Sequence, residues 1–194
     1  MKVIETERLL LRPLTANDAN DVFEWVSDPV VNTYMPYNLY TSVKDAETWI
    51  SSIKGDNHVF AFVLKKENKV IGSGSICFQS DSNAYELGYN LNKNYWNKGY
   101  TSEASLAMIQ WAYEELGVRD FVANHANANV ASAKILLKCG FKFSHYGQYS
   151  KYDGSETFDA SYYFMHKEEE VAGLKEQLYQ NGCAEMHGIG GLTL

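Results

Sequence analysis

The amino-acid sequence predicts an α/β domain in which helices flank a central mixed, mostly antiparallel sheet of about seven strands. Short apolar or alternating runs bounded by turn residues indicate the strands, and apolar positions with helical spacing separate some of them. Together they give the order β-α-α-β-β-β-α-β-α-β-β. Successive strands in the middle imply hairpins, and later strands separated by helices imply crossovers.

The individual elements follow from local signals. Pro13 ends the first strand, Gly55 and Gly117 close helices, and Glu67-Asn68 joins two strands into a hairpin. In the first half we expect a strand at 9–11, a helix from Thr15 or Asn17 to about Trp25, a helix at 43–53, and strands at 59–65 and 69–78. In the second half we expect a strand at 85–91, a helix at 102–116, a strand at 121–123, a helix at 130–138, and strands at 141–149 and 157–165.

Length and composition indicate one domain with an extension. The 194 residues are 45% hydrophobic and 21% charged, which is typical of a soluble globular protein. We assign residues 1–166 to the domain and 167–194 to a C-terminal extension. In the extension, Val171, Leu174 and Leu178 form a narrow apolar stripe before a glycine-rich end. A short helix here would dock on its own domain or on a second subunit in a homodimer; the alternative is a disordered tail.

The composition argues against several classes of function. The net charge is −7 and Lys and Arg form no cluster, which disfavours nucleic-acid binding. No apolar run approaches the roughly 18 residues of a membrane helix, and the polar N-terminus predicts a cytoplasmic protein. The three cysteines form no CxxC pair and the five histidines no HxxxH pattern, so no metal site is expected.

The segment 85–104 carries the strongest chemical signal. An alternating strand runs into a glycine-containing loop that opens a helix, and unpaired N–H groups at such a helix start bind anions such as phosphates. An ordinary strand-to-helix turn is an equally good interpretation of that geometry alone. The phosphate-binding P-loop is excluded because Lys98 precedes Gly99. The dinucleotide-binding pattern is excluded because Gly72-Ser73-Gly74 lacks a third glycine.

The sequence YWNKGYTSEA at 95–104 resembles the acetyl-CoA pyrophosphate loop of the GNAT superfamily of N-acetyltransferases. It is most similar to the RimJ/RimL-like branch, which acetylates ribosomal-protein N-termini. Trp96 and Thr101 depart from the superfamily's Q/R-x-x-G-x-G/A pattern. The segment from Asn129 to Phe141 resembles a second family motif, N-x-x-S followed by G-F, and residues 5–12 resemble the first strand of this branch.

This resemblance implies the GNAT fold, acetyl-CoA as co-substrate without a metal, and a primary amine as acceptor, either a small molecule or a protein N-terminus. The pyrophosphate would be held mainly by backbone N–H groups of one loop. The backbones of Tyr89 and Leu91 would face the pantetheine arm and the acetyl carbonyl, and Asn129 would contact the cofactor. The loop residues are Asn97, Lys98, Gly99, Tyr100, Thr101 and Ser102.

The catalytic residues are less well defined. Glu86 lies on the strand expected to be central and is our candidate for the base that neutralises the amine; its alternative is a solvated or ion-paired carboxylate. Leu136 stands where many relatives have the tyrosine that serves as the acid. The resemblance to relatives with the N-x-x-S motif implies Ser132 as the substitute acid; its alternative is a serine that only supports the start of its helix. Tyr34 and Tyr37 are expected in the acceptor pocket, unless their loop is simply packed.

Three functional hypotheses therefore stand beside one another. The first is an active N-acetyltransferase that works by direct attack of the amine in a ternary complex. The second is an acyl-CoA-binding regulatory module with weak or lost catalysis, which the missing tyrosine acid keeps open. The third is an interaction protein defined by its C-terminal extension.

Overall fold

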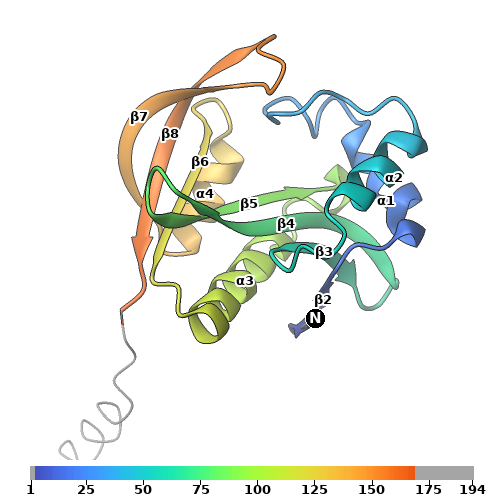
Figure 1. Cartoon of the computed structure of the whole chain (residues 1–194), viewed down its shortest axis with the longest axis horizontal. Helices are drawn as coiled ribbons and strands as arrows, with labels where there is room; N and C mark the ends of the chain where they lie inside the picture. The colour runs from blue at the N-terminus through green and yellow to red at the C-terminus, as the bar shows by residue number, and fades with distance from the viewer. Residues whose placement is uncertain (1–2, 169–194) are drawn as a thin grey trace, which may run out of the picture.

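The computed structural model describes residues 3–168 and contains one eight-stranded sheet with helices on both faces (Figure 1). The strands lie in the order β1-β2-β3-β4-β5-β6-β8-β7, and β5–β6 is the parallel pair. The strands are β1 Ile4–Glu5, β2 Leu9–Arg12, β3 Val59–Leu64, β4 Lys69–Gln79, β5 Ala84–Leu91, β6 Asp120–Ala126, β7 Lys142–Ser150 and β8 Thr157–His166. The helices are α1 Ala19–Val26, α2 Val43–Ser52, α3 Tyr100–Leu116 and α4 Val130–Lys138, with short 3₁₀ turns at Ala16–Asp18 and Lys93–Tyr95.

The expected mixed, mostly antiparallel sheet is confirmed, and several elements differ from the expectation in detail; the strand expected at 121–123, for example, is the longer β6. An eighth strand, β1, pairs with β2 through only two residues, which is too short to produce a periodic sequence signal. The helix expected from Ser102 begins two residues earlier, at Tyr100. The apolar stripe at Val171, Leu174 and Leu178, and with it the docking prediction, lies outside the described residues.

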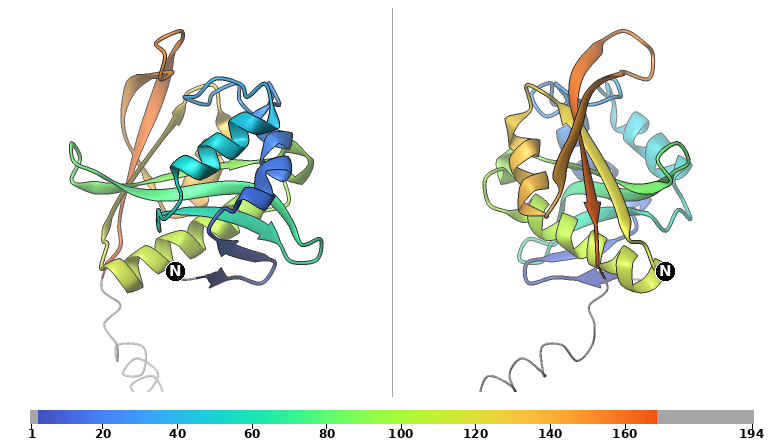
Figure 2. Two further views of the ribbon diagram at one scale, coloured as in Figure 1. Left: turned by 45° about the vertical axis from the view of Figure 1, so that its right-hand side comes forward. Right: turned by 90° about the vertical axis from the view of Figure 1, so that its left-hand side faces the viewer.

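Helices cover the two faces of the sheet separately, as the two side views in Figure 2 show. On one face α3 and α4 pack on the sheet through a large core that includes Phe62, Met108 and Phe121. On the other face α1 and α2 pack around Trp25 in a smaller core. The sheet between them presents one apolar side to each core, as the alternation of strand side chains requires.

Gly74 allows α3 to approach the sheet closely. A Cβ at this position would lie 2.6 Å from the ring of Phe62, 2.7 Å from Met108 and 2.9 Å from the carbonyl of Gly88. The glycine-serine run that resembles a nucleotide motif is therefore part of the continuous strand β4, as expected, and its glycine makes room for packing.

Strands β5 and β6 separate soon after they meet. Only two residue pairs, Tyr85 with Phe121 and Glu86 with Val122, are in register, although both strands continue for several residues. The rest of β5 is paired with β4 alone. The gap that opens between the two strands lies in the centre of the sheet.

Among residues 3–168 no helix combines the length and the apolar character that crossing a membrane requires. Within the same residues no three His, Cys, Asp or Glu side chains gather in a way that would hold a metal ion.

Candidate active site

The loop before α3 presents a row of free backbone N–H groups. The N–H groups of residues 97–102 donate to no carbonyl or side chain among the described residues. Asn97 and Gly99 have positive φ angles of 60° and 81°, and Gly99 is the N-cap of α3. Successive N–H groups in such a conformation form an anion-binding concavity at the positive end of the helix.

The side chains of the loop offer fewer groups to a bound anion than its backbone does. Thr101 and Ser102 are buried, so their hydroxyls lie away from the surface, while Asn97 and Gly99 are exposed. Lys98 donates through Nζ to the carbonyl of Asn94 at 2.9 Å. The residues expected to hold a pyrophosphate thus lie together at one helix start, and their N–H groups fit phosphate oxygens.

A clamp of two residues, Thr6 and Arg8 in the turn between β1 and β2, holds this loop in place. The guanidinium of Arg8 donates to the carbonyl of Lys98 at 2.8 Å, forms an ion pair with Glu103 at 2.6 Å and lies 4.4 Å from the ring centroid of Tyr100. Thr6 donates its hydroxyl to the same Glu103 at 2.6 Å. The sequence resemblance at 5–12 includes this turn, but it did not indicate the contact with a loop about 90 residues away.

The unpaired edge of β5 faces the gap toward β6. The N–H of Asn92 donates to Ile71 on the β4 side at 2.8 Å. Because alternate residues of a strand direct their backbone groups to opposite sides, Tyr89 and Leu91 face the gap. The indole Nε1 of Trp96 donates to the Leu91 carbonyl at 2.7 Å, so Leu91 offers the gap its N–H alone. Trp96, which breaks the family pattern, therefore joins the loop to the strand.

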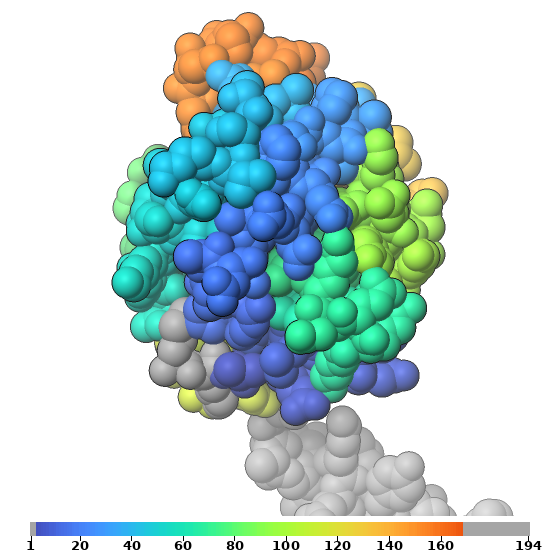
Figure 3. All heavy atoms as spheres, turned by 90° about the vertical axis from the view of Figure 1, so that its right-hand side faces the viewer, coloured from blue at the N-terminus to red at the C-terminus, as the bar shows by residue number. Residues whose placement is uncertain are grey.

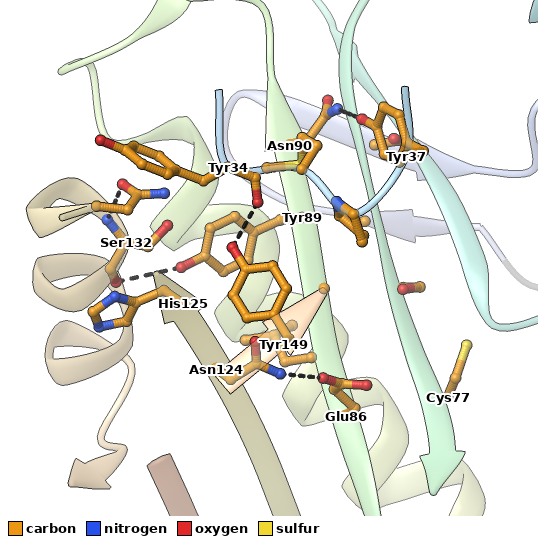
Figure 4. Close-up of a pocket in the computed structure, with 18 of the residues that line it drawn as sticks. Tyr34, Tyr37, Cys77, Glu86, Tyr89, Asn90, Asn124, His125, Ser132 and Tyr149 are labelled. Atoms are coloured by element: carbon orange, nitrogen blue, oxygen red, sulfur yellow. Dashed lines mark hydrogen bonds between the residues drawn. The ribbon is translucent and has the colours of Figure 1, made fainter. Parts of the chain in front are cut away.

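On the far side of the gap, α4 presents its first turn. Asn129 is the N-cap, and its Oδ1 accepts a hydrogen bond from the N–H of Ser132 at 3.2 Å. Figure 4 shows Tyr89 reaching from β5 toward this turn, where its hydroxyl donates to the Ser132 carbonyl at 3.4 Å. Burial raises the pKa of Tyr89. Leu136 and Cys139 belong to the core beneath the turn, as expected for Cys139.

Glu86 lies at the point where the gap opens, and two amides hold its carboxylate. Asn124 Nδ2 donates to Oε1 at 2.8 Å and Gln79 Nε2 donates to Oε2 at 2.9 Å. No ion pair joins it to a Lys or Arg among residues 3–168. Burial raises the pKa of Glu86, and the Asn124 hydrogen bond lowers it in part. The ion-paired alternative is therefore wrong for the described residues.

A cavity of about 720 Å³ joins these parts. Its lining includes Glu86, Tyr89, Asn129 and Ser132 together with the segment between α1 and α2 and the end of the β7–β8 hairpin. The carboxylate therefore shares one cavity with the first turn of α4. Tyr34 and Tyr37 also line this cavity, and Tyr37 accepts a short hydrogen bond from Asn90 Nδ2.

Two segments of this lining are distant in sequence but lie side by side: Figures 1 and 3 show the α1–α2 segment next to the tip of the β7–β8 hairpin. The Tyr149 hydroxyl donates to the Tyr34 carbonyl at 2.7 Å, and the Tyr152 N–H donates to the Pro36 carbonyl at 2.8 Å. Asn38 donates to Asp153 at 2.6 Å. Sequence reasoning missed Tyr149 and Tyr152, because nothing local in a polar hairpin indicates what it packs against.

Comparison with known proteins identifies this architecture. The family model of the GNAT acetyltransferase domain matches residues 8–142. The chain belongs to the GNAT acetyltransferase family. It is 32% identical over 167 residues to the uncharacterised N-acetyltransferase YnaD of Bacillus subtilis, covering 86% of this chain and 98% of YnaD. Family membership makes the protein an acetyl-CoA-dependent N-acetyltransferase.

Solved GNAT structures share the fold. A GNAT family acetyltransferase from Bacillus anthracis superposes with a TM-score of 0.78 at 28% identity, covering 87% of this chain and all of that one. An acetyltransferase from Salmonella typhimurium that modifies the N-terminal serine of ribosomal protein L7/L12 superposes with a TM-score of 0.71 at 16% identity. That match covers 86% of this chain and all of the other, and it shows a common fold.

Proposed function

We propose that this acetyltransferase moves the acetyl group onto a primary amine held in the 720 Å³ cavity, by direct attack in a ternary complex. One observation carries the proposal: an amide-held carboxylate, Glu86, stands where β5 and β6 separate, without a cation among the described residues to neutralise it. A carboxylate in that position, with a raised pKa, is suited to accept the proton of an ammonium group.

The cofactor side of the proposal rests on backbone groups. The free N–H groups of residues 97–102 would bind the pyrophosphate, and those of Tyr89 and Leu91 would face the pantetheine arm and the acetyl carbonyl. Lys98 and Tyr100 would take part through the same loop backbone, and Asn129 through its place at the α4 cap. Bound acetyl-CoA supplies the thioester that the neutral amine attacks.

The remaining step is return of a proton to the departing thiolate. We assign it to Ser132, which is half-buried in the first turn of α4 and lines the cavity. Tyr89 is the rival, because its hydroxyl enters the same gap and bonds the backbone of Ser132. Either hydroxyl would take the role of the tyrosine acid that many relatives have at the position of Leu136.

The acceptor is proposed to be a small amine or a protein N-terminus, as in the RimJ/RimL-like branch. The Salmonella relative that modifies a ribosomal-protein N-terminus supports the second option, together with the loop sequence at 95–104. A homodimer mediated by the C-terminal extension remains part of this proposal. Truncation after Lys167 followed by light scattering tests the homodimer.

The decisive experiment replaces Glu86 by Gln and follows release of the free thiol with an amine as acceptor. We expect kcat/KM to fall roughly 100-fold while the affinity for acetyl-CoA is unchanged. The loss should be largest at pH values above the pKa of Glu86, where the wild-type carboxylate is deprotonated and can act, and the acidic limb that its titration produces should disappear. An unchanged profile would remove Glu86 as the base.

A further inference from the structure

The acceptor cavity has an unusual distribution of charge. Among the described residues that line it, Glu86 is the acidic residue, and none is Lys or Arg. A second hollow of about 410 Å³ shares Glu86, Gln79 and Asn124 with this cavity. The described residues lining that hollow also include no Lys, no Arg and no further carboxylate. An acceptor at Glu86 therefore meets one carboxylate and no Lys or Arg, and the remaining basic side chains of the two hollows are His125 and His145.

Aromatic side chains make up much of the remaining lining. Tyr37 and Tyr40 lie with ring centroids 6.0 Å apart, and Trp49, Tyr149 and Tyr152 face the same cavity. The faces of such rings stack on a flat apolar body and attract an ammonium group. Their hydroxyls and the neighbouring amides supply neutral polar contacts, which suit a body with no charge of its own.

We propose that the acceptor is a primary amine on an uncharged, ring-sized body, and that the site rejects amines carrying a carboxylate or phosphate beside the amino group. A second anion next to the amine would lie close to Glu86 in a partly buried cavity, with no described cation to pair with it. Repulsion and desolvation both act against it. The inference rests on the proposed function, since it takes this cavity to be the acceptor site.

A matched panel of amines tests the inference on the full chain with acetyl-CoA. Phenylethylamine, phenylalaninamide and phenylalanine share one ring and one spacing, and only the last carries a carboxylate. With kcat/KM expressed per neutral amine, we expect phenylalanine to be poorer than the other two by on the order of 100-fold. Equal rates for all three would overturn the inference.

A charge-introducing variant provides the converse test. Tyr152 is 82% exposed at the rim of the cavity, so its side chain can be replaced without disturbing the core. Tyr152→Arg supplies the missing cation and should reduce the discrimination against phenylalanine by roughly tenfold. The control Tyr152→Gln removes the ring without adding charge and should leave the discrimination in place. An equal ratio in both variants would contradict the inference.

The outcomes separate this inference from the proposed function. If phenylalanine is acetylated as fast as its two analogues without a carboxylate, the acetyltransferase assignment stands and the proposed acceptor class is wrong. Thiol release with none of the three amines removes the acceptor class as well. The proposed function is then judged separately, by the rise in Tm that acetyl-CoA produces and by acetylation of peptide N-termini.

Discussion

The two sides of the gap between β5 and β6 are built in different ways. The loop side consists of backbone N–H groups from one continuous segment, residues 97–102, fixed by a glycine and by the start of α3. The cavity side consists of side chains from the α1–α2 segment, from β4 to β6 and from the β7–β8 hairpin. The loop side depends on the local conformation of one segment, whereas the cavity side depends on the tertiary fold that brings separate segments together.

This difference has a consequence for specificity. A backbone site can keep its ligand while most of its side chains vary, provided that the glycine and the helix start remain. A site made of side chains from separate segments changes its ligand when any one segment changes. We therefore expect variants of the loop to affect acetyl-CoA, and variants of the cavity to affect the amine.

The largest expected effect comes from the loop. Gly99→Asp places a carboxylate against the phosphates at a position with φ of 81°, and acetyl-CoA binding should be lost, with Kd raised at least roughly 100-fold. Gly55→Asp is the matched control, because Gly55 has φ of 90° and open space around it but lies far from the loop in sequence. Calorimetric titration of both variants with acetyl-CoA makes the comparison. Normal affinity in the Gly99 variant would refute the site.

The next largest effect concerns the proposed proton donor, Ser132, on the α4 side of the gap. Ser132→Ala should lower kcat roughly 30-fold with the KM for acetyl-CoA unchanged. The expected loss is modest because a thiolate, whose thiol has a pKa near 8.5, is a better leaving group than an alkoxide and depends less on a proton donor. Tyr89→Phe is the matched comparison, since it removes one hydroxyl from the other wall of the gap. If the Tyr89 variant alone loses activity, the donor is Tyr89.

The same contrast explains how far the sequence predicts the structure. The periodicity of helices and strands can be seen in short stretches of sequence, and so can the two motifs that contain Gly99 and Asn129. This local information was enough to predict the fold and the loop. Asn124, Gln79 and Tyr149 were missed because their importance arises from Glu86 and Tyr34, to which only the tertiary fold brings them. Asn124 carried one weak signal, a polar residue within the apolar strand β6.

A smaller effect is expected where the turn between β1 and β2 supports the loop. Arg8→Ala removes the donor to the Lys98 carbonyl and the partner of Glu103, so the loop should lose its fixed position and the KM for acetyl-CoA should rise roughly fivefold. The kcat with saturating acetyl-CoA should change little. Lys44→Ala breaks an exposed ion pair with Glu47 on α2, which touches neither the loop nor Arg8, and serves as the control. Equal KM values in the two variants would show that the contacts of Arg8 do not contribute to acetyl-CoA binding.

The smallest effect is a displacement of the pH profile, and it tests the cavity side. Burial raises the pKa of Glu86, while the hydrogen bond from Asn124 stabilises the charged form and so lowers it. Asn124→Ala removes that donor, so the pKa should rise further and the acidic limb of kcat/KM should move to higher pH. At alkaline pH, where Glu86 is ionised in both proteins, the rates should converge. The exposed Asn57→Ala is the control and should leave the limb in place. A limb that moves to lower pH, or stays fixed, would mean that the titrating base is a group other than Glu86.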